Sequence, residues 1–474
     1  MKSRIPFILW FSYAFVAAVL ILPALFNERI NGDIFWQRWL GAQILSDHRI
    51  PMHLGPETLS AVGASWVPQE WLLSVILALA QRTGTYMVLA IGAVLAVLAT
   101  MLLSELRSRR RGVQSPLLLA ACAILIGLSA RGTFGVRAQV FAWPLLALLL
   151  LLLDEGDAAI WWNIPLVAIW SNVHASVILA PIVALLYAVG AAAKARAWTP
   201  TVTRYAILVP ALAAASCANP LGWRIPLYAL SLERSPIHSF ISEWQPLRFR
   251  DYGLWLLVIP VALGIGVAWW RGVRLGPIDA LVTLAFGFLA FTALRNLPIF
   301  AIAVVPIACS NITKTIPSPK VRREQPLELA LQLIVAIVVL PIIALATFLH
   351  SDYSSVEARL PTSAIDFVAQ LPGPKRLFCF DFGACSLALG HSGVRSFMDG
   401  RCDPFPLDVW DQYRVLVEAG PGWKRILRSY NITQVLTPSS SPLALAIRAS
   451  KRWKVLYDDK TTLVFARRSP YVRT

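Results

Sequence analysis

The sequence predicts a polytopic α-helical membrane protein of about 11 transmembrane helices, followed by a small extracytoplasmic α/β domain. Two observations carry this prediction. Hydrophobic residues make up 57% and charged residues 15% of the 474 residues, whereas soluble domains have about 45–50% apolar and about 25% charged residues. Beyond residue 350 the composition changes, and no apolar run there is long enough to cross a bilayer. With only 6 Cys in so long a chain, a disulfide-dense secreted scaffold is excluded.

The transmembrane domain is predicted over residues 1–350. Apolar runs near the length of about 20 residues that a span needs lie near 6–26, 85–104, 116–131, 138–153, 160–174, 176–193, 205–218, 253–270, 277–294, 296–310 and 329–349. Residues 71–82 are too short to span, and residues 33–45 carry apolar side chains at helical spacing, so both predict helices in the membrane interface. Residues 27–84 are therefore predicted to form a first outer loop built of interfacial helices.

The charge distribution predicts the orientation. The formal net charge of +17 would favour nucleic acid as the partner of a soluble chain. Here the cations cluster between apolar runs, around Arg109, Arg196, Arg271 and Arg322, where they set topology and contact anionic lipid. A cytoplasmic N-terminus places all four clusters in the cytoplasm. An odd number of spans then places residues 351–474 outside.

The last residues, 351–474, predict an α/β domain because strand-like and helix-like pieces alternate. The strand-like pieces are 376–380, 434–436, 453–457 and 462–466, and the helix-like pieces are 363–371, 421–429 and 442–450.

Two further features of this domain concern its chemistry. Cys379, Cys385 and Cys402 lie where oxidation is permitted, and three cysteines leave one unpaired; which of them form a disulfide stays open. Their spacing matches no zinc motif. The segment Asp399-Gly400-Arg401 is interpreted as a turn with an internal ion pair, with a sugar-binding loop as the alternative.

Polar residues of the transmembrane domain gather at the predicted outer ends of the helices. Ionisable and amide residues are costly at membrane depth and are functional candidates by default. The opposite ends show mainly Lys and Arg clusters. The candidates are Asp33, Gln69, Glu70, Arg137, Gln139, Asn172, His174, Asn219, Glu243, Arg295 and Asn296.

Taken singly, these residues have simpler interpretations. Glu70 could cap the helix that follows it, since carboxylates favour helix N-termini. Arg137 and Arg295 could extend to lipid headgroups. His174 could be a packing histidine, and Asn219 in an Asn-Pro-Leu-Gly segment could belong to a turn.

Together the candidates supply the groups that one type of reaction needs, a base and a pair of phosphate-binding cations. A carboxylate such as Asp33 or Glu70 can take the proton from an acceptor hydroxyl, although Asp33 alone could equally be a solvated helix cap. Arg137 and Arg295 can hold a phosphate and stabilise the charge that it develops on leaving. This combination suits transfer from a lipid-linked phosphate. Substrate contacts are predicted for Gln139, Asn172, His174, Asn219, Glu243 and Asn296.

The chain from about Asp33 to about Phe465 resembles the GT-C superfamily of membrane glycosyltransferases. This superfamily includes protein O-mannosyltransferases and lipid A aminoarabinose transferases, and the likeness is to its bacterial polytopic members. The segments that carry it are GDIFWQRWLGAQIL, WVPQEWL, VRAQVF, WSNVHAS, ANPLGW, ISEWQP, ALRNLPIF, FDFGACSL and FMDGRCDPF.

The resemblance implies roles for individual residues. Asp33 matches the acidic position that acts as the catalytic base, Glu70 stands near a second acidic or histidine position, and Arg295 resembles a basic residue that binds lipid phosphate. The sequence departs from the Asp-Glu pair of the mannosyltransferases, since Ile34 follows Asp33. A metal-bridged acidic pair is therefore not expected, and no metal or other cofactor is predicted with certainty.

The predicted function is transfer of a sugar from a polyprenyl-phosphate donor to an extracytoplasmic glycan, lipid or protein. The expected partners are this donor, membrane lipids and an acceptor, without nucleic acid, at the bacterial inner (plasma) membrane. A transporter or flippase of lipid-linked sugars, an envelope polysaccharide polymerase or ligase, and a non-catalytic scaffold are the alternatives. The sugar, the acceptor, the stereochemistry and the oligomeric state are left open.

Overall fold

The computed structural model describes residues 12–14, 16, 33–84, 86–130, 133–232, 240–251, 253–315 and 360–468. The predicted span near 329–349 lies outside these residues, as does most of the span near 6–26. The chain divides into two compact units, called here the helical unit and the α/β unit. The helical unit comprises Met1–Arg29, Tyr86–Glu233 and His238–Ser351, and the α/β unit comprises Ile30–Thr85, Arg234–Ile237 and Asp352–Thr474.

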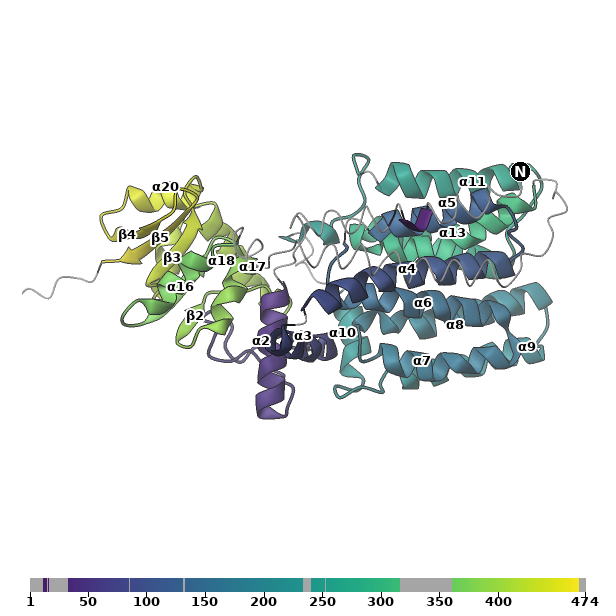
Figure 1. Cartoon of the computed structure of the whole chain (residues 1–474), viewed down its shortest axis with the longest axis horizontal. Coiled ribbons are helices and arrows are strands. Elements are labelled where there is room, and N and C mark those ends of the chain that lie inside the picture. Colours follow the sequence, from purple (N-terminus) through teal and green to yellow (C-terminus); the bar gives the residue numbers. More distant parts are fainter. Residues whose placement is uncertain are drawn as a thin grey trace, which may run out of the picture. The chain divides into compact units, whose positions relative to one another are not determined.

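The helical unit is a bundle of apolar helices that pack side by side (Figure 1). Short 3-10 or π-helical segments, η2 (Asp157–Trp162), η3 (Ala175–Ile178), η5 (Ser242–Trp244), η6 (Leu254–Val258) and η7 (Leu294–Asn296), occupy several of its junctions. Its described α-helices are α4 (Tyr86–Arg110), α5 (Pro116–Ser129), α6 (Ala138–Glu155), α7 (Asn163–Trp170), α8 (Leu179–Ala195), α9 (Pro200–Ala215), α10 (Arg224–Leu232), α11 (Ile259–Trp270), α12 (Pro277–Thr292) and α13 (Leu297–Thr313).

This unit has the features of a membrane protein. Among the described residues, four helices are long and apolar enough to cross a bilayer: Val88–Arg110, Ala138–Glu155, Ala175–Ala195 and Leu294–Thr313. Shorter apolar helices coincide with several other predicted spans, so the count of about 11 stays a prediction. The outward face of α12 leaves Leu284 and Phe288 each 70% exposed, while Val282 and Phe286 on its other face are buried. An apolar face of this kind is suited to contact with lipid.

One end of the bundle is joined by a buried ionic network that the sequence did not reveal. Arg107 in α4, only 1% exposed, donates from Nε to Oδ2 of Asp154 in α6 at 2.7 Å. Arg111 bridges Asp154 at 2.9 Å and Asp279 of α12 at 2.5 Å. The Tyr187 hydroxyl of α8 donates to the other oxygen of Asp154 at 2.5 Å. Two arginines of the predicted basic cluster therefore hold helices together rather than facing solvent or headgroups.

The α/β unit confirms the predicted small sheet domain. Its five strands are ordered β2-β1-β3-β5-β4; β1 pairs in parallel with β2 and β3, and β5 is antiparallel to β3 and β4. All four predicted strand-like pieces are strands, and only the short β2 was missed. The strands are β1 (Lys375–Cys379), β2 (Val394–Ser396), β3 (Gln434–Pro438), β4 (Trp453–Asp458) and β5 (Thr462–Arg467).

Helices flank this sheet (Figure 1). They are α16 (Thr362–Gln370), α17 (Phe382–Cys385), the 3-10 segment η8 (Ser386–Gly390), α18 (Leu407–Val417), α19 (Trp423–Ser429) and α20 (Pro442–Arg448). A disulfide joins Cys379 at the end of β1 to Cys385, and Cys402 is the one of the three outside this disulfide.

Most of the segment predicted as the first outer loop, Ile30–Thr85, belongs to the same compact unit as the tail. It contains α2 (Asp33–Asp47) and α3 (Trp71–Thr83), at the positions where interfacial helices were predicted. The two helices approach so closely that a Cβ on Gly41 would lie 1.9 Å from the carbonyl oxygen of Ser74. The loop also continues the sheet, since Leu59 N donates to Ser396 O at 2.8 Å and Ser396 N donates to Glu57 O at 2.9 Å.

Arg401 ties the loop to the tail. Its guanidinium pairs with Asp399 at 2.7 Å and with Glu57 at 2.9 Å. It also lies 5.1 Å from the ring centroids of both Trp39 and Trp66. Although burial acts in the opposite direction, these two carboxylates raise the pKa of Arg401 above its usual value. The predicted turn with an internal ion pair is thus observed, and the side chains of Asp399 and Arg401 are both 0% exposed, so neither is available to a sugar.

Candidate functional site

The helical unit brings several predicted site residues together into what we call the arginine cluster: Arg137, Gln139, Glu243, Trp244 and Arg295. Arg137 is the extended N-cap residue of α6, and Gln139 lies in the first turn of that helix. Arg295 lies in η7, where the extended Ala293 ends α12 and turns the chain towards α13. The segment after η5 is held beside it, because Leu294 N donates to Gln245 O at 3.0 Å. Junctions far apart in the sequence therefore converge.

The centre of the arginine cluster is one carboxylate between two guanidinium groups. Arg137 donates from Nη1 to Oε2 of Glu243, and Arg295 Nη1 lies 3.8 Å from Oε1 of the same residue. Burial favours the neutral acid, but the two arginines outweigh it and hold the pKa of Glu243 below its usual range. Glu243 is thus a bound anion at neutral pH.

Arg295 makes two further contacts. Its Nη2 donates to Oε1 of Gln139 at 2.8 Å, and its guanidinium carbon lies 4.1 Å from the ring centroid of Trp244. This stacking and hydrogen bonding fix the plane of the guanidinium group, which matters for the two-pronged binding of an oxyanion. The cluster is partly open: the side chains of Arg295, Arg137 and Glu243 are 18%, 22% and 24% exposed.

His174 lies near this cluster. It is 8% exposed, and the positive charge of Arg295 acts on its ring. Its Nδ1 accepts from the backbone N–H of Ser176 at 3.1 Å and lies 2.8 Å from the Ser176 hydroxyl. These contacts fix the orientation of the imidazole ring at the start of η3.

The three predicted asparagines make local bonds to the backbone. Asn172 Nδ2 donates to Ala168 O and Ala218 O, both at 2.9 Å, and so joins the ends of α7 and α9. Asn219 accepts from Leu221 N at 2.9 Å, as its interpretation as a turn residue requires. Asn296 Nδ2 donates to Leu289 O at 3.1 Å. Substrate contacts of these residues stay predictions.

The α/β unit holds the two predicted catalytic carboxylates on a second pair of elements. Asp33 begins α2, and its Oδ1 accepts from Nε1 of Trp36 at 3.2 Å. Glu70 is the N-cap of α3 but makes no side-chain capping bond. Instead Oε2 accepts from Nε2 of Gln37, and Oε1 accepts from Nε2 of Gln69 at 3.0 Å. Gln37 lies one helical turn after Asp33, so it links the two acidic positions through α2.

Some of these neighbours were missed at the sequence level. Gln37 and Trp244 were not predicted as site residues, although each lies within a segment that carries the resemblance. In the described part of the chain, no three His, Cys, Asp or Glu side chains gather into a group that could hold a metal ion. The described site residues include two arginines around one carboxylate in the helical unit and two carboxylates, Asp33 and Glu70, in the α/β unit.

The chain has the same fold as a solved oligosaccharyltransferase. It is similar to the archaeal oligosaccharyltransferase AglB from Archaeoglobus fulgidus, solved with an inhibitory peptide and a dolichol-phosphate, at a TM-score of 0.56 and 11% identity over 97% of this chain and 75% of that one. The apo form of the same enzyme gives a TM-score of 0.54, at 11% identity, over 98% and 74%.

ArnT from Cupriavidus metallidurans, solved with undecaprenyl phosphate, gives a TM-score of 0.48, at 14% identity, over 97% of this chain and 98% of that one. No protein-family model and no curated protein matches the sequence.

Proposed function

We propose that this protein is a glycosyltransferase that moves a sugar from a polyprenyl-phosphate donor to an extracytoplasmic glycan, lipid or protein. The GT-C fold supports the reaction class, and the similar AglB was solved with a lipid phosphate of this kind. The observation that carries the proposal is the arginine cluster, in which two converging guanidinium groups contact one carboxylate.

In the proposed donor complex, Arg137 and Arg295 bind the phosphate of the lipid. Their planar guanidinium groups match an oxyanion better than a lysine ammonium does. Trp244 and Gln139 hold Arg295 in place for this contact. Glu243 shares the arginines before the donor arrives, and the phosphate competes with it.

In the proposed transfer step, an acceptor oxygen attacks the anomeric carbon of the sugar. The bond between that carbon and the phosphate oxygen breaks, and its electron pair stays on the phosphate, where the two arginines stabilise the new charge. The proton of the acceptor goes to a carboxylate. We assign this base to Asp33, with Glu70 as the alternative, because Asp33 matches the acidic position that acts as the base in the superfamily that the sequence resembles.

A flippase of lipid-linked sugars is the alternative from another class. It would use charged or helix-breaking residues near the middle of the membrane. In the helical unit, the described ion pairs of α6 and α12 involve Arg137, Asp154, Asp279 and Arg295, which lie at or beside the helix ends. That distribution favours chemistry at the membrane surface.

Asp33→Asn tests the proposal. Full-length protein is reconstituted with ³²P-labelled polyprenyl-phosphate sugars extracted from its source membranes, and released polyprenyl phosphate is followed. Loss of a general base should lower the rate by about 10²–10⁴-fold, while Glu70→Gln should cost less. Asp47→Asn, at the exposed far end of the same helix, is the control and should transfer normally. Normal transfer by both the Asp33 and the Glu70 variant would overturn the proposal.

A further inference from the structure

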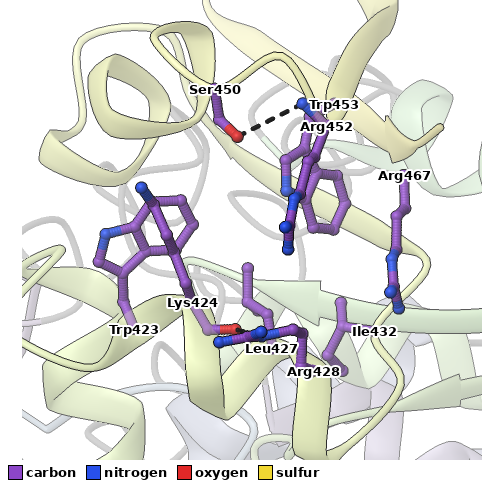
Figure 2. Close-up of a pocket in the computed structure, with 9 residues that line it drawn as sticks. All are labelled: Trp423, Lys424, Leu427, Arg428, Ile432, Ser450, Arg452, Trp453 and Arg467. Atoms are coloured by element: carbon purple, nitrogen blue, oxygen red, sulfur yellow. Dashed lines mark hydrogen bonds between the residues drawn. The ribbon is translucent and has the colours of Figure 1, made fainter.

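A basic cavity in the α/β unit has no part in the reaction proposed above. Its volume is about 290 Å³, near the lower limit of small-molecule sites, which measure roughly 300–1,000 Å³. Figure 2 shows its cationic side chains on different sides of the space, with two indole rings among them. The residues that carry the argument are Trp423, Lys424, Arg428, Arg452, Trp453 and Arg467.

The sequence places three of these four cations, Lys424, Arg428 and Arg452, in a region without acidic residues. Between Pro421 and Tyr457 there are seven Lys and Arg and no Asp or Glu. The fold then gathers four basic side chains around one cavity, from α19, from the start of β4 and from the end of β5. In the described part of the chain, none of these four has a carboxylate within ion-pair distance. Arg401, by contrast, has two carboxylate partners in the same unit.

Local contacts order part of the cavity lining. Arg428 Nε donates to Lys424 O at 3.2 Å, and the backbone N–H of Arg452 donates to the Ser450 hydroxyl at 3.4 Å (Figure 2). The Lys424 ammonium lies 5.4 Å from the ring centroid of Trp423. Four positive charges in a concave space produce a field that attracts an anion, and an indole offers an apolar face beside them.

We infer that this cavity binds a saccharide bearing carboxylate or phosphate groups, as part of the acceptor. The cations pair with the acidic groups, and the indoles contact the C–H face of the sugar ring. The choice of a saccharide rests on the proposed glycosyl transfer. Trp423 is only 8% exposed and Trp453 is half-buried, so the indoles line a cavity instead of projecting as membrane anchors do. A small ligand therefore fits better than a lipid surface.

Binding to the purified full-length protein tests the inference without donor or transfer. The probe is a hyaluronan tetrasaccharide, which carries glucuronate carboxylates, and chitotetraose is its neutral match. The acidic probe should bind at least about tenfold more tightly than the neutral one. The double variant Arg452→Gln/Arg467→Gln should lose about tenfold or more in affinity for it. Inorganic phosphate at equal concentration should not displace it.

Lys451→Gln/Lys454→Gln is the matched control. Both lysines are exposed and absent from the cavity lining, and Lys454 follows Trp453 on the strand, so it points to the opposite face of the sheet. This variant removes the same charge and should bind the acidic probe as the wild type does. If both double variants lost the same affinity for the acidic probe, the net charge of the protein would explain the loss, and the inference would be overturned.

Other outcomes are also decisive. Equal binding of the neutral probe, or displacement of the acidic probe by inorganic phosphate, would refute an acidic saccharide as ligand. Binding to phosphatidylglycerol vesicles that requires Arg452 and Arg467, without binding of the saccharide, would make the cavity a lipid-contact site. Because no donor is present, failure here leaves the Asp33 result intact, and normal transfer by the Asp33 variant leaves this binding intact.

Discussion

Glu243 is held by two arginines, and this pairing makes it a competitor for the ligand that the arginines are proposed to bind. With Glu243 ionised, the three side chains carry one net positive charge; without it they carry two. A site of low polarity strengthens such charge effects relative to water. Removing the charge of Glu243 should therefore strengthen the binding of another anion by Arg137 and Arg295.

Glu243→Gln should bind undecaprenyl phosphate severalfold more tightly than the wild type, because the variant no longer supplies a competing anion. Isothermal titration of the full-length protein measures this affinity. Gln139→Ala, which removes an uncharged neighbour of Arg295, is the control and should not bind more tightly. Weaker binding by Glu243→Gln would instead mean that Glu243 positions the arginines.

The polar candidates at the helix ends could be predicted from the sequence, because a polar side chain beside an apolar run is easily recognised. Their pairing could not. Two helices, α11 and α12, separate Glu243 from Arg295, and Glu243 follows Arg137 by 106 residues, so only the folded chain brings the three together. The same holds for Glu70, whose partner Gln37 lies 33 residues earlier and replaces the expected capping role.

At the scale of elements, α6 carries a polar group at each end. Arg137 begins it in the arginine cluster, and Asp154 near its last turn enters the buried network with Arg107 and Arg111. The helix between them is almost entirely apolar. Asp154 and Glu155 at the end of α6 therefore have a structural explanation in the ion pairs that they make.

Asp154→Asn should destabilise the helical unit strongly, because it leaves Arg107 buried without a counter-charge. Removing one partner of a buried ion pair costs about 3–5 kcal/mol. Thermal unfolding of the purified protein in detergent should show a Tm lower by several degrees. Glu155→Gln is the adjacent control, since Glu155 pairs with Arg110, which is 70% exposed, and an exposed pair contributes about 0–1 kcal/mol. Equal Tm values for both variants would contradict a structural role for the network.

Elements with a strong local signal were predicted well. Short apolar pieces predicted four of the five strands, and the apolar stripe after Asp33 predicted α2. The strand β2, Val394–Ser396, was missed because three residues are too few for an alternating pattern. Burial of Arg107 was missed because a run of arginines after a span normally marks the cytoplasmic surface.

At the scale of the whole molecule, the segment Ile30–Thr85 and the tail form one compact unit although they are far apart in the sequence. Arg401, bound to Asp399 and Glu57 and placed near Trp39 and Trp66, explains this association. Sequence patterns located both segments but gave no sign that they pack together, because such contacts depend on long-range folding. The proposed base at Asp33 is therefore supported by a unit that includes the tail.

The predicted topology makes the two sides of the last span distinguishable. Reporter fusions at Ser318 and Arg359 should show opposite sidedness, with Ser318 cytoplasmic and Arg359 outside, because the basic cluster around Arg322 is retained in the cytoplasm. Alkaline phosphatase and green fluorescent protein activities report the two sides. The same sidedness at both positions would refute the predicted orientation and, with it, an extracytoplasmic acceptor.

The most direct test of the central claim is the affinity of the purified full-length protein for undecaprenyl phosphate. The account predicts that Arg295→Ala binds at least about tenfold more weakly than the wild type, since a charged hydrogen bond contributes about 1.5–3 kcal/mol. Arg295→Lys should restore part of the loss, because a point charge lacks the guanidinium geometry. Arg271→Ala, which alters an exposed arginine after α11, should bind normally. Equal affinities of the wild type and Arg295→Ala would contradict a lipid-phosphate site at the arginine cluster.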